Sequence, residues 1–244
     1  MRSSSVLLGI AASLLRPAAA HGFVTGVKVN DGAWFAGSDP VWWYYPTGEA
    51  PATTGWDALN QDIGFVEPAS FGTSNISCHK SATVGQNFIE AAAGDELTFF
   101  WNTWPDSHKG PIINYIAPYA ANAGSLSFSK ISQGSIVSGT TWVTDELIAN
   151  NFTSSTTIPK NLKAGDYVIR HEIIALHGAS SDNGAQAYPQ CLNLRVSGSG
   201  SVSPSGGTAG TSLYKRGDAG IMFNLYVSYD SYPYPGPALW TAAN

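Results

Sequence analysis

Hydrophobic and polar residues alternate in five separate stretches of the chain, which is the period expected of strands that bury one face. The first stretch runs from Phe23 to Val29 and ends at the turn-forming triplet Asn30-Asp31-Gly32. The other four span residues 96–101, 112–116, 167–176 and 191–196, and a turn that contains Gly and Asp precedes two of them. The pattern therefore predicts at least five strands.

Helical spacing is weak throughout and is found only near residues 144–150. Strands that recur between Gly and Pro turns predict an all-β fold, namely an antiparallel immunoglobulin-like or fibronectin-like β-sandwich with long ordered loops and little helix. Residues 198–210 have the Ser/Gly composition of a linker, but the apolar run 220–226 and the proline-containing tail that follow are too short for a second domain. We therefore expect 198–210 to be a surface loop, with no carbohydrate-binding module after it.

Six large aromatic residues are crowded among Gly, Pro and Thr between residues 33 and 62. They are Trp34, Trp42, Trp43, Tyr44, Tyr45 and Trp56. Rings in such polar company either face a ligand or fold back as a small core under a long loop. The sequence leaves both interpretations open for each ring.

The first twenty residues have the pattern of a secretory signal peptide. Arg2 precedes an apolar run of about ten residues, which is shorter than the roughly 20 that a membrane-spanning helix needs. Small residues, Ala18 and Ala20, occupy the positions that signal peptidase reads before His21. We expect residues 1–20 to be removed and residues 21–244 to be secreted to the extracellular space as a single domain, without a membrane anchor.

Charge argues for a neutral partner. Without Arg2 and Arg16 the mature chain has 12 − 2 = 10 basic against 17 acidic residues, a balance of −7. That balance disfavours nucleic acid and anionic membranes and suits a neutral substrate.

Two residue types predict covalent features of an exported protein. The two cysteines, Cys78 and Cys191, are expected to form a disulfide, the alternative being two free thiols. The triplets that begin at Asn75 and Asn151 are sequons for N-glycosylation.

An N-terminal histidine provides unusual metal chemistry. Once cleaved, His21 would offer both a free α-amine and a ring nitrogen to one ion. A second imidazole would complete a set of three nitrogens, which suits copper(II). His108 is the candidate for it, because it lies in a turn-rich segment between two predicted strands. The alternative is that His108 is an ordinary solvated loop histidine.

Several longer motifs connect these residues. They are His21-Gly22-Phe23-Val24, Gly55-Trp56, Asp62-Ile63-Gly64-Phe65-Val66, Ile76-Ser77-Cys78-His79, Trp104-Pro105-x-Ser107-His108-x-Gly110-Pro111, Arg170-His171-Glu172-Ile173-Ile174-Ala175-Leu176-His177, Gln186-x-Tyr188-x-x-Cys191 and Tyr232-x-x-Pro235-Gly236-Pro237. Through them the chain resembles the fungal lytic polysaccharide monooxygenases of auxiliary activity family nine, over essentially all of the mature sequence. The visible departure is Pro118-Tyr119-Ala120-Ala121, where many relatives carry a second cysteine pair.

The resemblance implies a role for individual residues. His21 and His108 are expected to hold one copper ion, with Tyr188 as an axial group, and His177 and Gln186 are expected to assist catalysis beside it. His171 and Glu172 are read as structural or as outer groups of the site. Four tyrosines are expected to bind substrate: Tyr232 by the motif, and Tyr234, Tyr44 and Tyr45 as further candidates.

The resemblance also implies the reaction. It predicts that a copper ion cycling between Cu²⁺ and Cu⁺, with an electron donor and O₂ or H₂O₂, oxidatively cleaves cellulose or a related β-1,4-glucan at C1 or C4. The donor would be a small reductant or a protein similar to cellobiose dehydrogenase, and the enzyme a monomer. The alternatives are a non-catalytic protein that binds cellulose, loosens cell walls or binds copper, and a glycoside hydrolase with two carboxylates. The sequence leaves the choice between C1 and C4 open.

Overall fold

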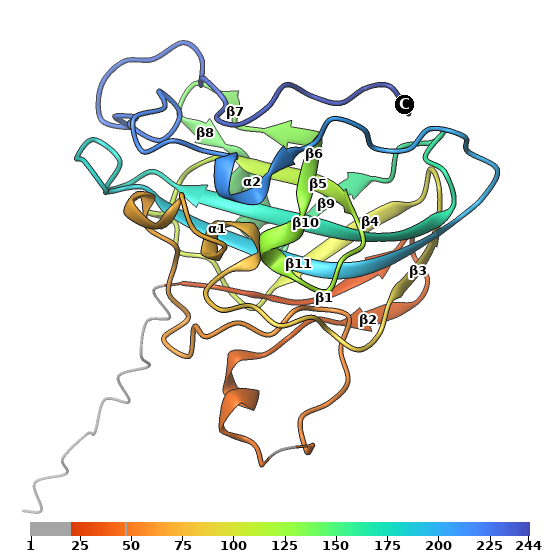
Figure 1. Cartoon of the computed structure of the whole chain (residues 1–244). Helices are drawn as coiled ribbons and strands as arrows, with labels where there is room; N and C mark the ends of the chain where they lie inside the picture. Colours follow the sequence, from red (N-terminus) through yellow and green to blue (C-terminus); the bar gives the residue numbers. More distant parts are fainter. Residues whose placement is uncertain (1–20, 47) are drawn as a thin grey trace, which may run out of the picture.

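The structure is a computed structural model that describes residues 21–46 and 48–244, and its strands are arranged in two main layers (Figure 1). The smaller sheet contains β2 (Trp34–Ala36), β1 (Val24–Val29), β4 (Glu96–Trp101) and β9 (Thr153–Thr157), in that order. The larger sheet contains β12 (Thr208–Ala209), β6 (Ser127–Gly134), β5 (Ile112–Pro118), β10 (Gly165–Ala175), β11 (Gln186–Ser197) and β3 (Ile89–Ala92), in that order. A separate hairpin pairs β7 (Ile136–Ser138) with β8 (Thr141–Trp142).

Pairing within the two sheets is antiparallel, except that β3 runs parallel to β11. The predicted β-sandwich is confirmed. All five predicted strands are present, as β1, β4, β5, β10 and β11, and β11 begins five residues earlier than the alternation indicated.

The larger sheet is buried on both faces, which explains the nearly continuous apolar sequence of its central strands. Ile169 and Ile173 of β10 pack between the two sheets, whereas Val168 and Ile174 face a second core on the outer side. Loops, α1 (Asn75–Cys78) and the C-terminal segment cover that outer core. Figure 1 shows the C-terminal segment, in dark blue, running along the upper side of the molecule.

Helices are short in the described ranges. They are α1, α2 (Val143–Ala149) and four 3₁₀ helices, Pro40–Tyr44, Pro68–Ser70, Ala123–Ser125 and Gly210–Ser212. α2 confirms the predicted helical patch, and the Asp145 carboxylate caps its first turn by accepting a hydrogen bond from Trp142 N. No helix within residues 21–46 and 48–244 has both the length and the apolar character needed to cross a bilayer.

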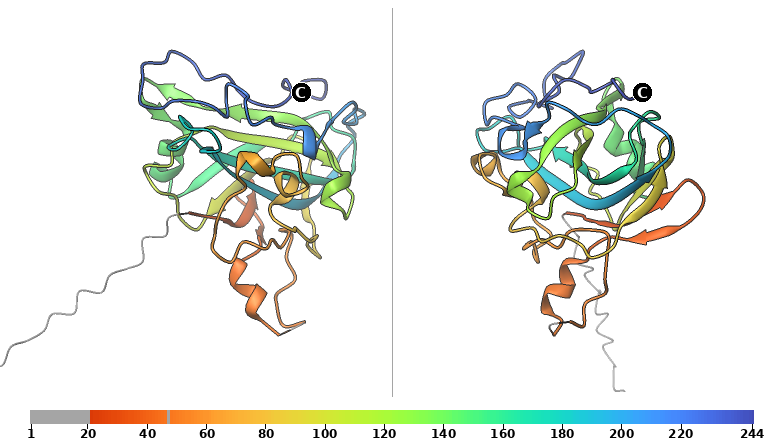
Figure 2. Two further views of the ribbon diagram at one scale, coloured as in Figure 1. Left: turned by 60° about the vertical axis from the view of Figure 1, so that its left-hand side comes forward. Right: turned by 45° about the vertical axis from the view of Figure 1, so that its right-hand side comes forward.

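Two loops that the sequence singled out lie differently on the sandwich. Figure 2 shows the aromatic loop around Pro40–Tyr44 projecting away from the layered strands. Residues 198–210 lie against the domain, since Gly200 and Val202 form bridges with Lys163 and Leu162. The Ser/Gly segment therefore lies on the sandwich, and its end is not all loop, since Thr208–Ala209 form β12.

The disulfide Cys78–Cys191 is present, with the two Cα atoms 5.2 Å apart. It joins α1 to the middle of β11 across 113 residues of sequence. The predicted signal peptide, residues 1–20, lies outside the described residues.

Candidate metal centre

His21 lies just before β1, an inner strand of the smaller sheet, and is held there by the residues that follow it. Phe23 N donates to the Asn102 side-chain oxygen at 2.9 Å, and Asn102 N donates to Phe23 O at 3.0 Å. Gly22 is required there, because a Cβ atom on it would lie 2.2 Å from Thr103 O. The backbone of the expected mature N-terminus is therefore held close to the chain that leaves β4.

His108 is presented by the loop between β4 and β5. Trp104 Nε1 donates to His108 O at 2.9 Å, which closes the loop under the imidazole. Gly110 lets the loop approach β10, because a Cβ atom there would lie 1.9 Å from Ile174 O. The centroids of the His108 and His21 rings are 5.6 Å apart, so the structure brings the two predicted metal ligands together.

Tyr188 and Gln186 reach the same place from the start of β11. Tyr188 is fully buried, and its ring centroid is 5.8 Å from that of His21 and 5.0 Å from that of Trp104. The Tyr188 hydroxyl donates to Gln186 Oε1 at 2.7 Å. Cys191 follows three residues later, so the disulfide anchors the strand that carries both side chains.

His177 completes the group of predicted residues. It follows β10, and its ring centroid is 3.9 Å from that of His108. Phe65, which had no predicted role, packs with its ring centroid 5.8 Å from that of His21 and 6.0 Å from that of Tyr188. It belongs to the motif Asp62-Ile63-Gly64-Phe65-Val66, so its position in that motif was the available signal.

Burial keeps the three histidines of the group neutral at neutral pH. The pKa of His108 is lowered to about 4, first by desolvation and then by the charges of protonated His177 and His21. The pKa values of His21 and His177 are also lowered, chiefly by desolvation. Desolvation raises the pKa of Tyr188, so its phenol stays protonated. Neutral imidazoles have the lone pairs that a metal needs.

Within the part of the chain that the structure describes, two ring nitrogens of the histidine group lack the hydrogen bonds that buried polar atoms usually have, as expected of a site that holds an ion. His108 Nδ1 pairs with Ser107 Oγ at 3.1 Å, whereas the buried His108 Nε2 and His177 Nδ1 have no hydrogen-bond partner among the described residues. A buried polar atom without a partner costs about 1–3 kcal/mol and calls for an explanation such as an ion or a ligand.

The identity of the donors limits which ion could bind. Across the described part of the chain, no group of three or more His, Cys, Asp and Glu side chains could hold a metal. Two imidazoles therefore need a donor of another kind, which the α-amine of a cleaved His21 would supply. Nitrogen donors of this type favour copper.

The tyrosines predicted to bind substrate differ in their exposure to solvent. Tyr44 and Tyr45 are 72% and 45% exposed on the projecting aromatic loop. Tyr232 is only 5% exposed, its ring packs against Trp142 and Phe223, and its hydroxyl donates to Gly220 O at 2.6 Å.

The Tyr232 ring is therefore too buried to offer a free face to a polymer, and the substrate role expected of it stays an untested prediction. Tyr234 is half-buried against Tyr232, and its hydroxyl pairs with Ser135 Oγ at 2.6 Å, which points to a structural role.

Tyr226 had no predicted role, but it has the exposure that was expected of Tyr232. It is 74% exposed, and its hydroxyl donates to His177 O at 3.1 Å, which places it beside the histidine group. It ends the apolar run 220–226, and sequence alone could not tell which tyrosine of the tail would be exposed.

The remaining candidates lie away from the group. His171 is fully buried, with Nδ1 bonded to the Asn114 side-chain oxygen and Nε2 accepting from Trp101 Nε1. Glu172 forms a buried ion pair with Arg170 at 2.6 Å. Both residues have structural partners, as expected. Of the two sequon asparagines, Asn151 is exposed and Asn75 is half-buried.

Comparison with known proteins agrees with this geometry. Residues 21–234 match the family model described as Auxiliary Activity family 9 (formerly GH61). The chain is 51% identical, over 92% of its length and 93% of the relative's, to the AA9 family lytic polysaccharide monooxygenase F of Malbranchea cinnamomea. It is 50% identical, over 91% of its length and 92% of the relative's, to the protein of the same name in Emericella nidulans.

A solved structure supports the same assignment. The extended catalytic domain of a lytic polysaccharide monooxygenase from Hypocrea jecorina superposes with a TM-score of 0.86 at 41% identity, and the match covers 92% of each chain. Sequence, fold and the grouped histidines agree, and the chain belongs to auxiliary activity family 9.

Proposed function

We propose that residues 21–244 form one secreted, extracellular and monomeric domain that uses copper to cleave β-1,4-glucan chains such as cellulose by oxidation. The observation that carries the proposal is the buried His108 Nε2, which has no hydrogen-bond partner within residues 21–46 and 48–244 and belongs to a ring whose centroid is 5.6 Å from that of His21. The family match also begins at His21, the first residue expected after cleavage.

The residues that would hold the ion are His21, through its α-amine and ring, and His108, with the Tyr188 phenol nearby. Copper bound there would supply the one-electron chemistry by which O₂ or H₂O₂, with an external reductant, inserts oxygen into a C1–H or C4–H bond of the glucan. The hydroxylated carbon would then expel the glycosidic oxygen, which breaks the chain. A small reductant or a protein similar to cellobiose dehydrogenase would supply the electrons.

The neighbouring side chains would prepare the site without binding the ion tightly. Gln186 Oε1 already accepts from Tyr188, which leaves the amide N–H groups of Gln186 as donors for an oxidant. The half-buried His177 imidazole can hold or pass a proton beside His108. Phe65 and Trp104 pack against the Tyr188 ring and keep water from its inner side.

The substrate would lie across the exposed aromatic side chains around this group. Tyr226, hydrogen-bonded to His177 O, offers a flat ring next to the site, and Tyr44 and Tyr45 offer further rings on the projecting loop. Flat rings provide contact area with little loss of conformational entropy.

Products distinguish this function from its rivals. Mature protein incubated with cellulose, copper, ascorbate and H₂O₂ should release aldonic or 4-keto oligosaccharides, as measured by mass spectrometry. Unmodified oligosaccharides alone would indicate a hydrolase, and adsorption without soluble sugar would indicate a binding protein.

Two variants test the proposed ligands. His108→Ala removes one ligand and should abolish oxidised products. A chain with one extra residue before His21 keeps every side chain but loses the α-amine at that position, and should also be inactive. Unchanged product yield in both would refute the site.

A further inference from the structure

A second site is suggested by a groove at the opposite end of the sandwich. Its cavity volume is about 440 Å³, and its lining includes Trp34, Gln86, Asn87, Phe88, Glu90 and Arg195. Gln186 starts β11 and Arg195 lies nine residues further along it, a distance of roughly 30 Å at the usual rise per strand residue. The groove is therefore remote from the histidine group.

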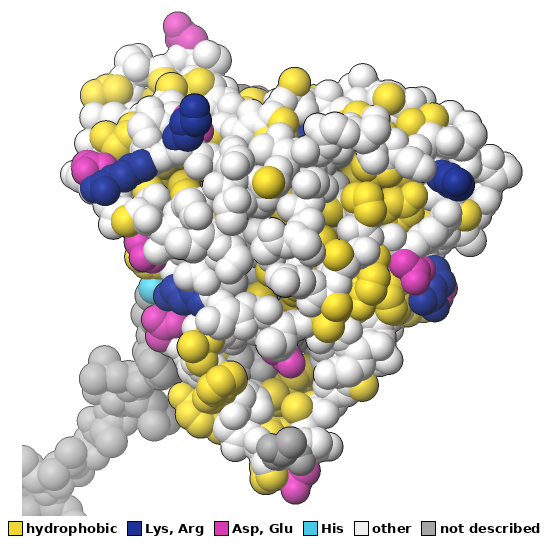
Figure 3. Space-filling model, viewed as in Figure 1, with side chains coloured by type: hydrophobic (Ala, Val, Ile, Leu, Met, Phe, Trp, Pro, Cys, Tyr) yellow, Lys and Arg dark blue, Asp and Glu magenta, His cyan; other side chains and the backbone are white. Residues whose placement is uncertain are grey.

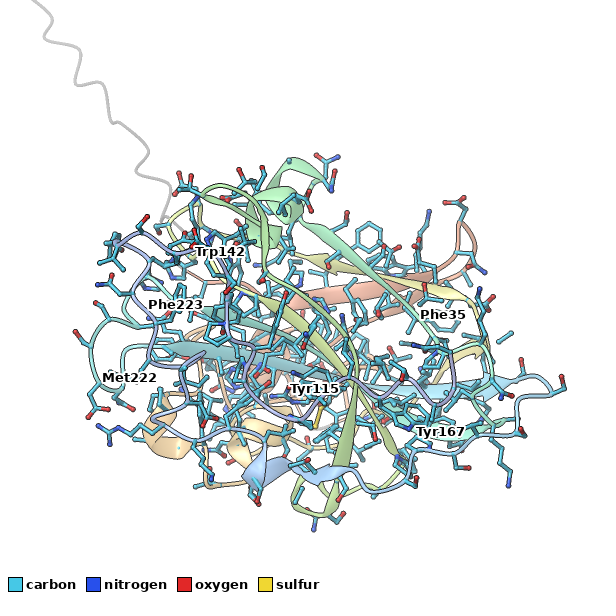
Figure 4. The ribbon with its side chains drawn as sticks, turned by 90° about the horizontal axis from the view of Figure 1, so that it is seen from above. Phe35, Tyr115, Trp142, Tyr167, Met222 and Phe223 are labelled. Carbon is cyan, nitrogen blue, oxygen red and sulfur yellow. A yellow bond between two sulfur atoms is a disulfide. The ribbon has the colours of Figure 1, made fainter. Side chains whose placement is uncertain are left out.

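The figures support this placement. In Figure 4, Phe35, which also lines the groove, lies toward one end of the molecule, and Phe223, whose N–H donates to Ala179 O two residues after His177, lies toward the other. In Figure 3, hydrophobic side chains gather on the right of the visible face beside a mixed cluster of acidic and basic side chains, in the region where Figure 1 places β2 and β3.

Trp34 forms a flat platform in the groove. Gly26 on the neighbouring strand β1 leaves room for the indole, because a Cβ atom there would lie 2.2 Å from Trp34 Cζ2. The Phe100 ring supports the indole in a T-shaped contact, with centroids 5.0 Å apart. Trp34 is nevertheless 49% exposed, so the indole is held by the sheet and still open to solvent.

The polar rim is held in position and keeps hydrogen-bonding capacity. Gln86 Oε1 accepts from Thr53 N at 3.3 Å, and Asn87 Nδ2 donates to Ala52 O at 3.0 Å. These bonds fix the two amides. They use the acceptor of Gln86 and a donor of Asn87, which leaves the Gln86 N–H groups and the Asn87 oxygen to offer a ligand both a donor and an acceptor.

Charge at the rim favours a neutral ligand. The Arg195 guanidinium binds both carboxylate oxygens of Asp166, at 2.7 and 3.0 Å, and lies 3.3 Å from Glu90 Oε1. It also stacks over the Phe88 ring, 4.4 Å from its centroid. Two carboxylates thus offset the one cation, so a polyanion would find no unbalanced positive charge here.

We propose that this groove is a second carbohydrate-binding site, which takes neutral pyranose units of a β-linked glucan with one sugar ring stacked on Trp34. An open indole beside paired amide donors and acceptors matches a sugar ring, which has apolar faces and an equatorial belt of hydroxyls. Binding in the groove needs no metal. It would give the protein two separate attachments to one polymer and raise its effective concentration at the substrate.

The test is a titration of isotope-labelled, metal-free protein with cellohexaose, followed by NMR. The Trp34 indole N–H and the side-chain amides of Gln86 and Asn87 should shift and saturate. Trp34→Ala and Trp34→Leu should weaken binding at the groove about tenfold, the size of an aromatic stacking contribution, whereas Trp34→Phe should keep part of it. Titration of a sulfated glucan should leave these signals unmoved.

A control variant and a fold check keep the result interpretable. Val137→Ala trims another exposed apolar side chain, which is 46% exposed, and should leave the groove signals unchanged. The thermal unfolding midpoint of each variant shows whether that variant is folded. If a variant is unfolded, the titration of the unsubstituted protein alone decides whether the groove binds cellohexaose. The proposal is overturned if saturating cellohexaose leaves the signals of Trp34, Gln86 and Asn87 in place, or if only the sulfated polymer moves them.

The choice of a β-linked glucan as the ligand rests on the proposed function, but the failure of one proposal can be distinguished from the failure of the other. Groove binding without oxidised products would leave this inference standing and remove the enzymatic one, and oxidised products without groove binding would do the reverse.

Discussion

Single side chains of the tail differ sharply in exposure, which bears on the proposed contact with substrate. Tyr226 and Tyr232 lie six residues apart in the tail, yet one is 74% exposed and the other 5%. Tyr226→Ala should therefore lower adsorption to crystalline cellulose and the yield of oxidised products roughly two- to tenfold, while copper affinity stays unchanged. Adsorption isotherms, product analysis and copper titration calorimetry measure the three quantities.

Tyr232→Phe is the matched control. It removes the hydroxyl bonded to the buried Gly220 O and should lower the free energy of unfolding by about 1–2 kcal/mol without changing adsorption. A loss of adsorption in this variant and not in Tyr226→Ala would reverse the two assignments.

The chemistry of residue types accounts for what the sequence could predict at the site. His21 and His108 follow from the donors that an N-terminal histidine offers, whereas Tyr188, Gln186 and His177 rested on motif resemblance. Tyr226 could not be found in this way, because exposure in an irregular tail depends on contacts with distant loops, and periodicity does not encode those contacts.

At the scale of elements, the disulfide connects α1 to β11 and stabilises the fold. Replacing both Cys78 and Cys191 by Ser releases a loop of 113 residues and should lower the free energy of unfolding by up to about 4–5 kcal/mol in the chain-entropy model. Chemical denaturation under oxidising conditions measures the change. A loss below about 1 kcal/mol would mean that packing alone holds β11 in place.

His79, at the end of α1, makes stability depend on pH. It is buried, its Nε2 donates to Gly64 O at 3.0 Å, and its Nδ1 accepts from Lys80 N at 2.9 Å, so both nitrogens are used in the neutral form. Desolvation lowers its pKa from 6.5 to about 4. Between these values the unfolded chain binds the proton and the folded chain does not, so stability falls as the pH decreases from about 6.5 to about 4.

The dependence of stability on pH that we assign to His79 can be measured directly. In metal-free protein, His79→Asn should reduce the dependence of the unfolding free energy on pH by about 1 kcal/mol per pH unit within that window, whatever its effect on stability at pH 7. Urea denaturation at several pH values between 4.5 and 7 tests this. Parallel curves for the two proteins would show that His79 does not set the slope.

Sequence patterns predicted a strand well where burial of one face produced a clear alternation of apolar and polar residues. β4 alternates buried and partly exposed side chains, and its predicted bounds, 96–101, are those observed. β9, Thr153–Thr157, was missed because an edge strand made of Thr and Ser carries no apolar signal. The apolar run 220–226 lies in an irregular segment, from which Ile221 packs into the outer core.

For the whole molecule, binding of copper should raise thermal stability through mass action. An ion that binds only the folded state at a free concentration 100 times its dissociation constant stabilises that state by about 2.7 kcal/mol. Calorimetry should show a higher thermal midpoint with copper and reversal by a chelator. His108→Ala should lose most of the copper-dependent shift, and an equal shift in both proteins would place the ion elsewhere.

The histidine group also sets an order of events during synthesis. His21 packs against Tyr188, so 188 − 21 = 167 residues must follow His21 before the two rings can meet. At about 5–20 residues per second, translation of that stretch takes roughly ten to thirty seconds. Until then, the proposed copper site lacks the Tyr188 ring that packs beside His21. Under the proposed function, copper would therefore enter the complete site only after synthesis and folding of the chain.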